Sequence, residues 1–165
     1  HHQFGGLARG ERSDVGHEVA QGHVDLVPDR RNGGNPRGGH RPQQLGKLMG
    51  LKVIAAVGSD EKMEICRKYG ATMFVNYAKE KMRDKVKELT GGNGADIIYD
   101  AVGGDAFDES IRCIAWYGRL LVVGFAAGRI PSLPANLALL KSCDGRGVFY
   151  GGWRAREPEG ARQAP

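Results

Sequence analysis

The stretch LKVIAAVGSDEKMEICRKYG, residues 51–70, combines two patterns that together decide the fold class. Its first part, residues 51–58, is a continuous apolar run that ends in glycine, which is typical of a strand buried on both faces of a parallel sheet. Its second part begins with Ser59 or Asp60 as a helix N-cap, has acidic residues in the first turn and stops at Gly70. The stretch therefore predicts a buried strand, a turn and an amphipathic helix.

The same alternation continues along the chain. Short apolar runs predict strands, and amphipathic segments that end in glycine predict helices. In chain order these are a strand at 72–77, a helix at 79–92, a strand at 95–104, a helix at 105–118 and a strand at 119–128. This strict alternation favours an α/β fold with a doubly wound parallel sheet of the Rossmann type. We expect a further helix at 132–143 and a last short strand or turn at 147–152.

The chain joins two compositions. Apolar residues are sparse before residue 42 and dense between Leu45 and Leu140, so the core is expected in the second part. Every lysine lies between Lys47 and Lys141, whereas all five histidines lie in the first 46 residues. We therefore divide the chain into an irregular segment at 1–42, an incomplete Rossmann-type domain at 43–153 and a loose tail at 154–165.

Charge, cysteines and hydropathy limit the classes of protein. The net charge of +5 is spread along the whole chain, which favours a solvated surface over a nucleic-acid footprint. Cys66, Cys113 and Cys143 form no C-x-x-C pair, so we expect reduced, packed thiols rather than a zinc site. No apolar run reaches the roughly 20 residues that cross a bilayer, and the start lacks a signal-peptide core. These observations predict a cytoplasmic protein without nucleic-acid or membrane partners.

Two longer runs carry a family resemblance. They are QLGKLMGLKVIAAVGSDEKMEICRKYGATMFVNY and LTGGNGADIIYDAVGGDAFDESIRCIAWYGRLLVVGFAAGRIPSLPANLALLK. Over residues 43–153 the chain resembles the cofactor domain of the zinc-independent quinone oxidoreductases of the medium-chain dehydrogenase/reductase superfamily. The resemblance implies an NADPH-binding Rossmann domain whose enzyme transfers hydride to a quinone or another α,β-unsaturated carbonyl. The family's N-terminal catalytic domain has no counterpart in these 165 residues, which predicts a fragment that is inactive in isolation.

The glycine-rich turn of the family is missing. Its place is taken by HVDLVPDRRNGGNPRGGHRPQ, residues 23–43, which contains neither G-x-G-x-x-G nor A-x-G-G-V-G. Those glycines let the backbone approach a pyrophosphate, so their absence predicts weak dinucleotide binding. Residues 1–42 are either a divergent segment or an out-of-frame translation. The candidate central strand is HVDLVP at 23–28, and we expect either a poor strand there or a split sheet.

The residues after the second and third strands of the family bear on the cofactor. An NAD enzyme usually has an acidic residue at the end of the second strand, whereas here the strand ends in Gly58 and Ser59. The resemblance implies contacts from Ser59, Lys62 and Tyr77 to the 2′-phosphate of NADPH. The alternative is an N-cap followed by an exposed lysine, and the nearby Asp60 leaves the two possibilities open.

The later strand ends predict the rest of the site. Parallel strands bind ligands at their carboxyl edge, and two predicted strands end there in small residues. Phe149 and Tyr150 lie near the nicotinamide by the same resemblance, although an edge strand also uses aromatic residues. The predicted cofactor residues in this part are Asp100, Val102, Gly103, Gly124, Phe125, Ala126, Phe149 and Tyr150.

Neither a metal site nor a catalytic side chain is predicted. GHEVAQGH at 16–23 resembles a zinc motif, but His17 and His23 are six residues apart and would lie on different helix faces. Hydride transfer needs no protein nucleophile, because the cofactor carries the chemistry. The function predicted is therefore part of an NADPH-dependent quinone or enone reductase. The alternative is a non-catalytic dinucleotide-binding or dimerisation module that pairs through the sheet edge.

Overall fold

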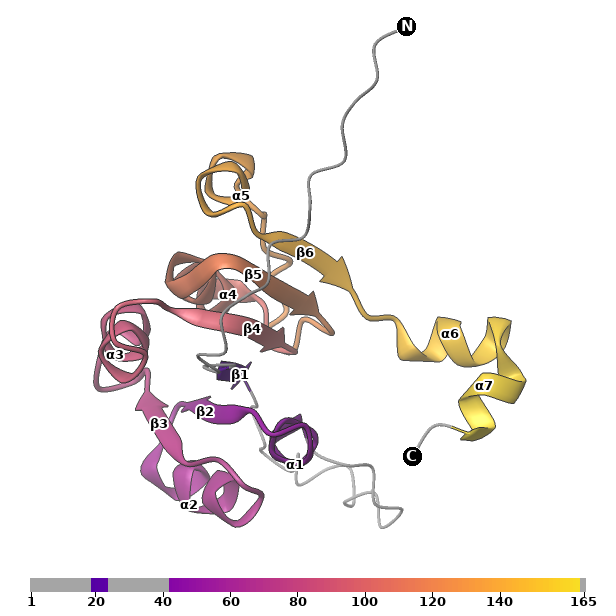
Figure 1. Cartoon of the computed structure of the whole chain (residues 1–165), viewed down its shortest axis with the longest axis horizontal. Helices are drawn as coiled ribbons and strands as arrows, with labels where there is room; N and C mark the ends of the chain where they lie inside the picture. Colours follow the sequence, from indigo (N-terminus) through magenta and orange to yellow (C-terminus); the bar gives the residue numbers. More distant parts are fainter. Residues whose placement is uncertain (1–18, 24–41, 164–165) are drawn as a thin grey trace, which may run out of the picture.

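The computed structural model describes residues 19–23 and 42–163, which contain one six-stranded parallel sheet with helices on both faces (Figure 1). The strand order β3-β2-β1-β4-β5-β6 is that of a doubly wound sheet, which confirms the predicted fold class. The strands are β1 Val19–His23, β2 Lys52–Val57, β3 Met73–Asn76, β4 Ala95–Asp100, β5 Ile114–Val122 and β6 Asp144–Gly147.

In chain order, helices α1 to α5 lie between the strands and α6 and α7 follow the last strand. They are α1 Pro42–Leu48, α2 Asp60–Lys68, α3 Met82–Leu89, α4 Gly104–Ser110, α5 Ala135–Lys141, α6 Tyr150–Arg156 and α7 Pro158–Gln163, with a 3₁₀ turn η1 at Ile111–Cys113. None of the helices in the described ranges combines the length and the apolar character that a bilayer crossing requires.

The core has two layers, one on each face of the sheet. Alternate residues of β2 enter opposite layers: Ile54 packs with α3 and α4, whereas Val53 packs with Cys66 of α2. Both faces of this strand are thus covered, as its continuous apolar run predicts.

The central position of the sheet is filled. β1 pairs in parallel with β2 on one side, from Val19 opposite Lys52 to His23 opposite Ala56, and with β4 on the other. The sheet is therefore not split. Of the segment at 23–28 expected here, only His23 belongs to β1, and residues 24–28 lie outside the described ranges.

The helix predicted at 105–118 is wrong in its second half. α4 ends at Ser110, and β5 already begins at Ile114. The Ser110 hydroxyl donates to the carbonyl of Phe107 at 2.9 Å, which competes with the helical pattern. Gly118 lets the backbone of β5 pass close to the Ile114 side chain, because a Cβ on Gly118 would lie 2.6 Å from Ile114 Cγ1. The spacing of apolar residues in 105–118 is compatible with both a helix and a buried strand.

The C-terminal elements also differ from the prediction. β6 ends at Gly147, where a last strand or turn was expected to begin. Two short helices, α6 and α7, occupy most of the part expected as a loose tail, and they lie apart from the sheet (Figure 1). Pro158 stands at the first position of α7, where a missing N–H costs nothing.

Candidate functional site

The carboxyl ends of the parallel strands meet along one edge of the sheet. In an open α/β sheet this edge binds ligands. The described strands end there at His23, Val57, Asn76, Asp100, Val122 and Gly147, and most predicted site residues lie within a few residues after these positions.

At the β2–β3 end of this edge, Tyr77 covers the turn after β2. A Cβ built on Gly58 would lie 3.1 Å from the Tyr77 hydroxyl oxygen, so the ring packs tightly on this glycine. The Tyr77 N–H donates to the Val57 carbonyl at 3.0 Å and fixes this approach. Ser59 follows Gly58 as the N-cap of α2, but its hydroxyl makes no capping hydrogen bond. Ser59 thus adjoins the glycine that Tyr77 covers, and Lys62 lies in the first turn of α2.

Asp60 is held by a side-chain network that the sequence did not reveal. The Asn76 side-chain amide donates to Asp60 Oδ1 at 2.7 Å, and the Lys79 ammonium pairs with Asp60 Oδ2. Asn76 is itself buried, with its backbone N–H bonded to Glu80 Oε1 at 2.9 Å. The bond to Lys79 and then that to Asn76 lower the pKa of Asp60 below its usual value. Both carboxylate oxygens of Asp60 are therefore engaged on the β3 side.

Asp100 closes the turn after β4. Its Oδ1 accepts the N–H groups of Val102 at 2.9 Å and Gly103 at 3.0 Å. The residue is fully buried, and its Oδ2 has no hydrogen-bond partner among the described residues. A buried, unpartnered carboxylate oxygen is costly, which makes this oxygen a position where a further donor is expected.

The turn after β4 and the loop after β5 form one unit. Val123 N–H donates to the Asp100 carbonyl at 2.8 Å, and Ala126 N–H donates to the Ala101 carbonyl at 3.1 Å. A Cβ on Gly124 would lie 3.3 Å from that same Ala101 oxygen. Backbone contacts thus bring together six predicted residues, namely Asp100, Val102, Gly103, Gly124, Phe125 and Ala126.

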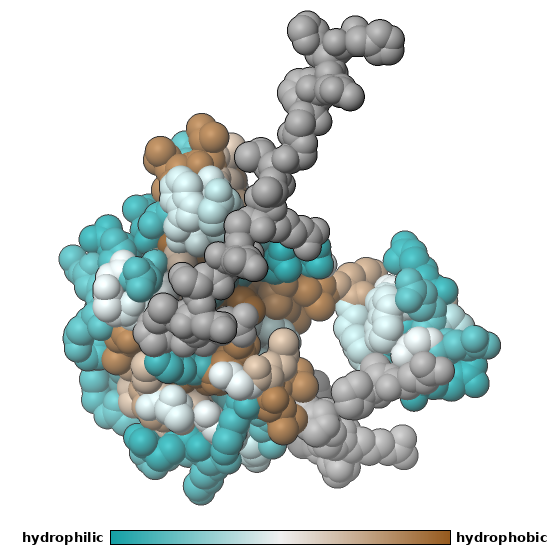
Figure 2. Space-filling view, viewed as in Figure 1, coloured by the Kyte–Doolittle hydropathy of each residue, from teal (hydrophilic) through white to brown (hydrophobic). Residues whose placement is uncertain are grey.

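A cavity of about 300 Å³ lies between the ends of β5 and β6. Phe125 and Phe149 line it from the two sides. Apolar surface continues along the chain that leads from β6 toward α6 (Figure 2). Tyr150 does not line this cavity: its ring lies 5.8 Å from that of Trp153 and 5.9 Å from the Arg154 guanidinium carbon. The structure therefore brings Phe149, but not Tyr150, to the predicted site.

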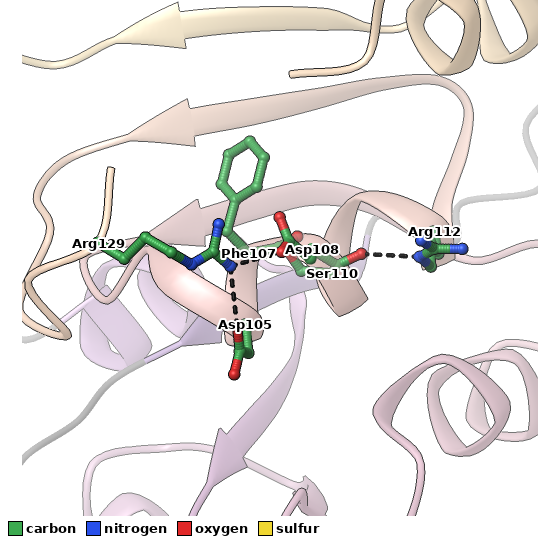
Figure 3. Close-up of polar contacts among 6 residues, drawn as sticks. All are labelled: Asp105, Phe107, Asp108, Ser110, Arg112 and Arg129. Carbon is green, nitrogen blue, oxygen red and sulfur yellow. Dashed lines mark hydrogen bonds and ion pairs between the residues drawn. The ribbon is translucent and has the colours of Figure 1, made fainter. Parts of the chain in front are cut away.

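Arg129 is a second feature that the sequence did not reveal. It lies in the middle of the loop 123–134 between β5 and α5, and its guanidinium contacts two carboxylates of α4, Asp105 and Asp108 (Figure 3). Asp108 and then Asp105 raise the pKa of Arg129, so the side chain stays charged. An arginine in a glycine-rich loop gives no signal in the sequence, because its partners lie more than 20 residues earlier.

The predicted zinc-like motif contributes no described site. His17 lies outside the described residues, and His23 is in β1. In the part of the chain that the structure describes, no three His, Cys, Asp or Glu side chains are grouped so that they could hold a metal ion.

Comparisons with known proteins find similarity to dehydrogenases and quinone oxidoreductases. The family model described as zinc-binding dehydrogenase matches residues 39–164. The quinone oxidoreductase-like protein 2 homolog of Nematostella vectensis is 44% identical over 117 residues, covering 71% of this chain and 32% of that protein. Quinone oxidoreductase-like protein 2 of Mus musculus is 47% identical over 106 residues, covering 64% and 30%.

A solved structure agrees as well. The Escherichia coli quinone oxidoreductase, crystallised with NADPH, aligns with a TM-score of 0.69 at 25% identity and covers 88% of this chain and 43% of that one. The present chain spans about a third of the length of the curated relatives that it matches.

Proposed function

We propose that this chain, which belongs to the zinc-binding dehydrogenase family as a member of its zinc-independent quinone oxidoreductase type, holds NADPH along the carboxyl edge of its sheet. It contains a nicotinamide dinucleotide-binding domain. For the whole enzyme we propose reduction of a quinone or another α,β-unsaturated carbonyl. Bound NADPH supplies the hydride, and the residues of this chain hold and orient it.

The observation that carries the proposal is the state of Asp60. A carboxylate at this end of the edge normally selects NADH, because it accepts from the ribose 2′-hydroxyl and repels a 2′-phosphate. Here Asn76 and Lys79 engage both oxygens of Asp60. Ser59, Lys62 and Tyr77 supply hydroxyl and ammonium groups at the same end of the edge, and such groups suit a phosphate. This balance of charge favours NADPH.

The β4–β5 end suits the nicotinamide half of the same molecule. Gly103 and Gly124 keep the backbone surface free of side chains, and Phe125 and Phe149 give the neighbouring cavity apolar walls. A flat ring with one polar edge fits such walls. The unpartnered Oδ2 of Asp100 lies at the start of this region.

Calorimetric titration of the chain with NADPH and NADH tests the proposal. We expect NADPH to bind more tightly than NADH, with the preference reduced by high salt because the 2′-phosphate contacts are ionic. Equal affinities, or no binding of either dinucleotide, would contradict it.

A second function, dimerisation through the sheet edge, is supported by the position of β6. It is the last strand in the order, pairs only with β5 among the described strands, and exposes all four of its residues. An unpaired edge strand is a template for pairing with another chain. Sedimentation velocity over a range of concentrations tests this: we expect a dimer, and a monomer at every concentration would rule it out.

A further inference from the structure

Arg129 joins the loop after β5 to helix α4. Its Nη2 lies 2.9 Å from Asp105 Oδ1 and 2.5 Å from Asp108 Oδ2. The two aspartates are three residues apart and so lie on one face of α4. Figure 3 shows the arginine side chain reaching across to both carboxylates from the loop after β5.

The backbone of Arg129 is tied to the same place. Its carbonyl accepts the N–H of Gly104 at 3.1 Å. Gly103 has φ +70°, and a Cβ there would lie 3.1 Å from this carbonyl oxygen and 3.1 Å from Phe125 Cδ1. The loop therefore packs onto the turn after β4 with no room for a side chain, and Phe125 is part of the contact.

Backbone hydrogen bonds from Val123 and Ala126 hold the start of the loop to β4 and its turn. Arg129 adds the two ion pairs of its side chain with α4 to the backbone bond with Gly104. Phe125 is linked to this end of the stretch, because its carbonyl accepts the N–H of Gly128 at 2.9 Å. Its surface is 41% exposed, and its ring lies on the cavity between β5 and β6.

We propose that Arg129 is a positioning residue for the nicotinamide half of the cofactor: by tethering the loop to Asp105 and Asp108 it sets where Phe125 stands over the cavity. The proposal rests on the proposed function. Lysine should replace the arginine only in part: one nitrogen, Nη2, makes both contacts, and a lysine ammonium also offers several N–H groups, but its side chain is shorter.

The ligand pair NADPH and 2′,5′-ADP separates this role from general stability. Both carry the 2′-phosphate, but 2′,5′-ADP lacks the nicotinamide. We expect Arg129→Gln to weaken NADPH binding by about threefold to fivefold, as two partly exposed ion pairs allow, and to leave 2′,5′-ADP binding unchanged. Arg129→Lys should lie between wild type and Arg129→Gln.

Arg112→Gln is the matched control. Arg112 also contacts α4, through the Asp108 carbonyl at 3.2 Å, but its side chain lies at the opposite end of the helix from the loop (Figure 3). It should change neither affinity. Thermal melting shows whether each variant folds. If Arg129→Gln does not fold, the affinities of Arg129→Lys for the two ligands test the proposal instead.

The outcomes are distinct. A parallel loss of NADPH and 2′,5′-ADP affinity, or no loss of either, overturns the positioning role while leaving the proposed function standing. If the wild-type chain binds neither ligand, both the proposed function and this inference are wrong.

Discussion

The two ends of the carboxyl edge are built by different means. At the β2–β3 end, side chains make the site: Asn76 and Lys79 hold Asp60, and Tyr77 packs on Gly58. At the β4–β5 end, backbone groups make most of it, in a ladder between two loops with glycines at the close contacts, and the Asp100 carboxylate ties the turn after β4. In the proposed function, the side-chain network fixes charge and so selects the dinucleotide, whereas the backbone ladder fixes shape and so sets where the nicotinamide ring lies.

The largest effect is expected at Asp100, which holds the backbone-built end together. Asp100→Ala leaves the buried N–H groups of Val102 and Gly103 without their acceptor, which costs about 2–4 kcal/mol of unfolding free energy. Asp100→Asn should cost clearly less, because its amide oxygen still accepts both. Urea unfolding of the three proteins measures this. Equal losses for Ala and Asn would mean that the charge, not the acceptor, matters.

Gly103 tests the same end through sterics. Its φ of +70° and ψ of −152° are accessible almost only to glycine, so Gly103→Ala should cost about 1–3 kcal/mol. Gly91 is a control, since it also has positive φ but nothing within 4 Å of an added Cβ. Gly91→Ala should cost less in the same urea experiment. If the two losses are equal, the close packing on Phe125 and Arg129 contributes nothing.

Lys62 tests the side-chain-built end. Loss of one charge-assisted contact to the 2′-phosphate should cost about 1.5–3 kcal/mol of NADPH affinity and leave NADH affinity nearly unchanged. Calorimetric titration of Lys62→Ala with both dinucleotides measures the ratio. Lys68→Ala, in the last turn of the same helix, is the control. An unchanged ratio in Lys62→Ala would remove this residue from the site.

The sequence predicts the backbone-built end better than the side-chain-built end. Strand ends followed by small residues mark Gly103 and Gly124 directly, because the chemistry lies in the local sequence. Asp60, Asn76 and Lys79 come from different elements, so only the fold shows that they meet. The placement of Tyr150 was also beyond the local sequence: its neighbour Phe149 lines the cavity, but one residue further the chain enters α6 and the ring lies against Trp153.

The position of β1 and the start of β5 could not be predicted from the pattern of apolar residues. β1, VAQGH, has too few apolar residues to be recognised as a central strand, and it is identified only by its pairing with β2 and β4. At the start of β5 the apolar residues are spaced in a way that a helix would also show. In both cases the deciding contacts join residues far apart in the chain.

The smallest effect, and the sharpest test of the difference between the two ends, concerns Lys79. Lys79→Ala leaves the Asp60 carboxylate uncompensated, so it repels a 2′-phosphate and becomes able to accept from the 2′-hydroxyl of NADH. Because both side chains are about two-thirds exposed, we expect the NADPH:NADH affinity ratio to fall only about twofold to fivefold, and less at high salt. Asp60→Ala should not lower the ratio, and in Asp60→Ala/Lys79→Ala it should return to that of Asp60→Ala. A ratio that is unchanged in Lys79→Ala, or effects that simply add in the double variant, would show that Asp60 faces away from the cofactor whether or not Lys79 holds it.

The same network makes stability depend on pH. The pKa of Asp60 is lowered in the folded chain, so its contribution to stability is present at neutral pH and is lost as the pH falls through the folded value. The melting temperature of wild type relative to Asp60→Asn should accordingly decrease between pH 7 and about pH 3.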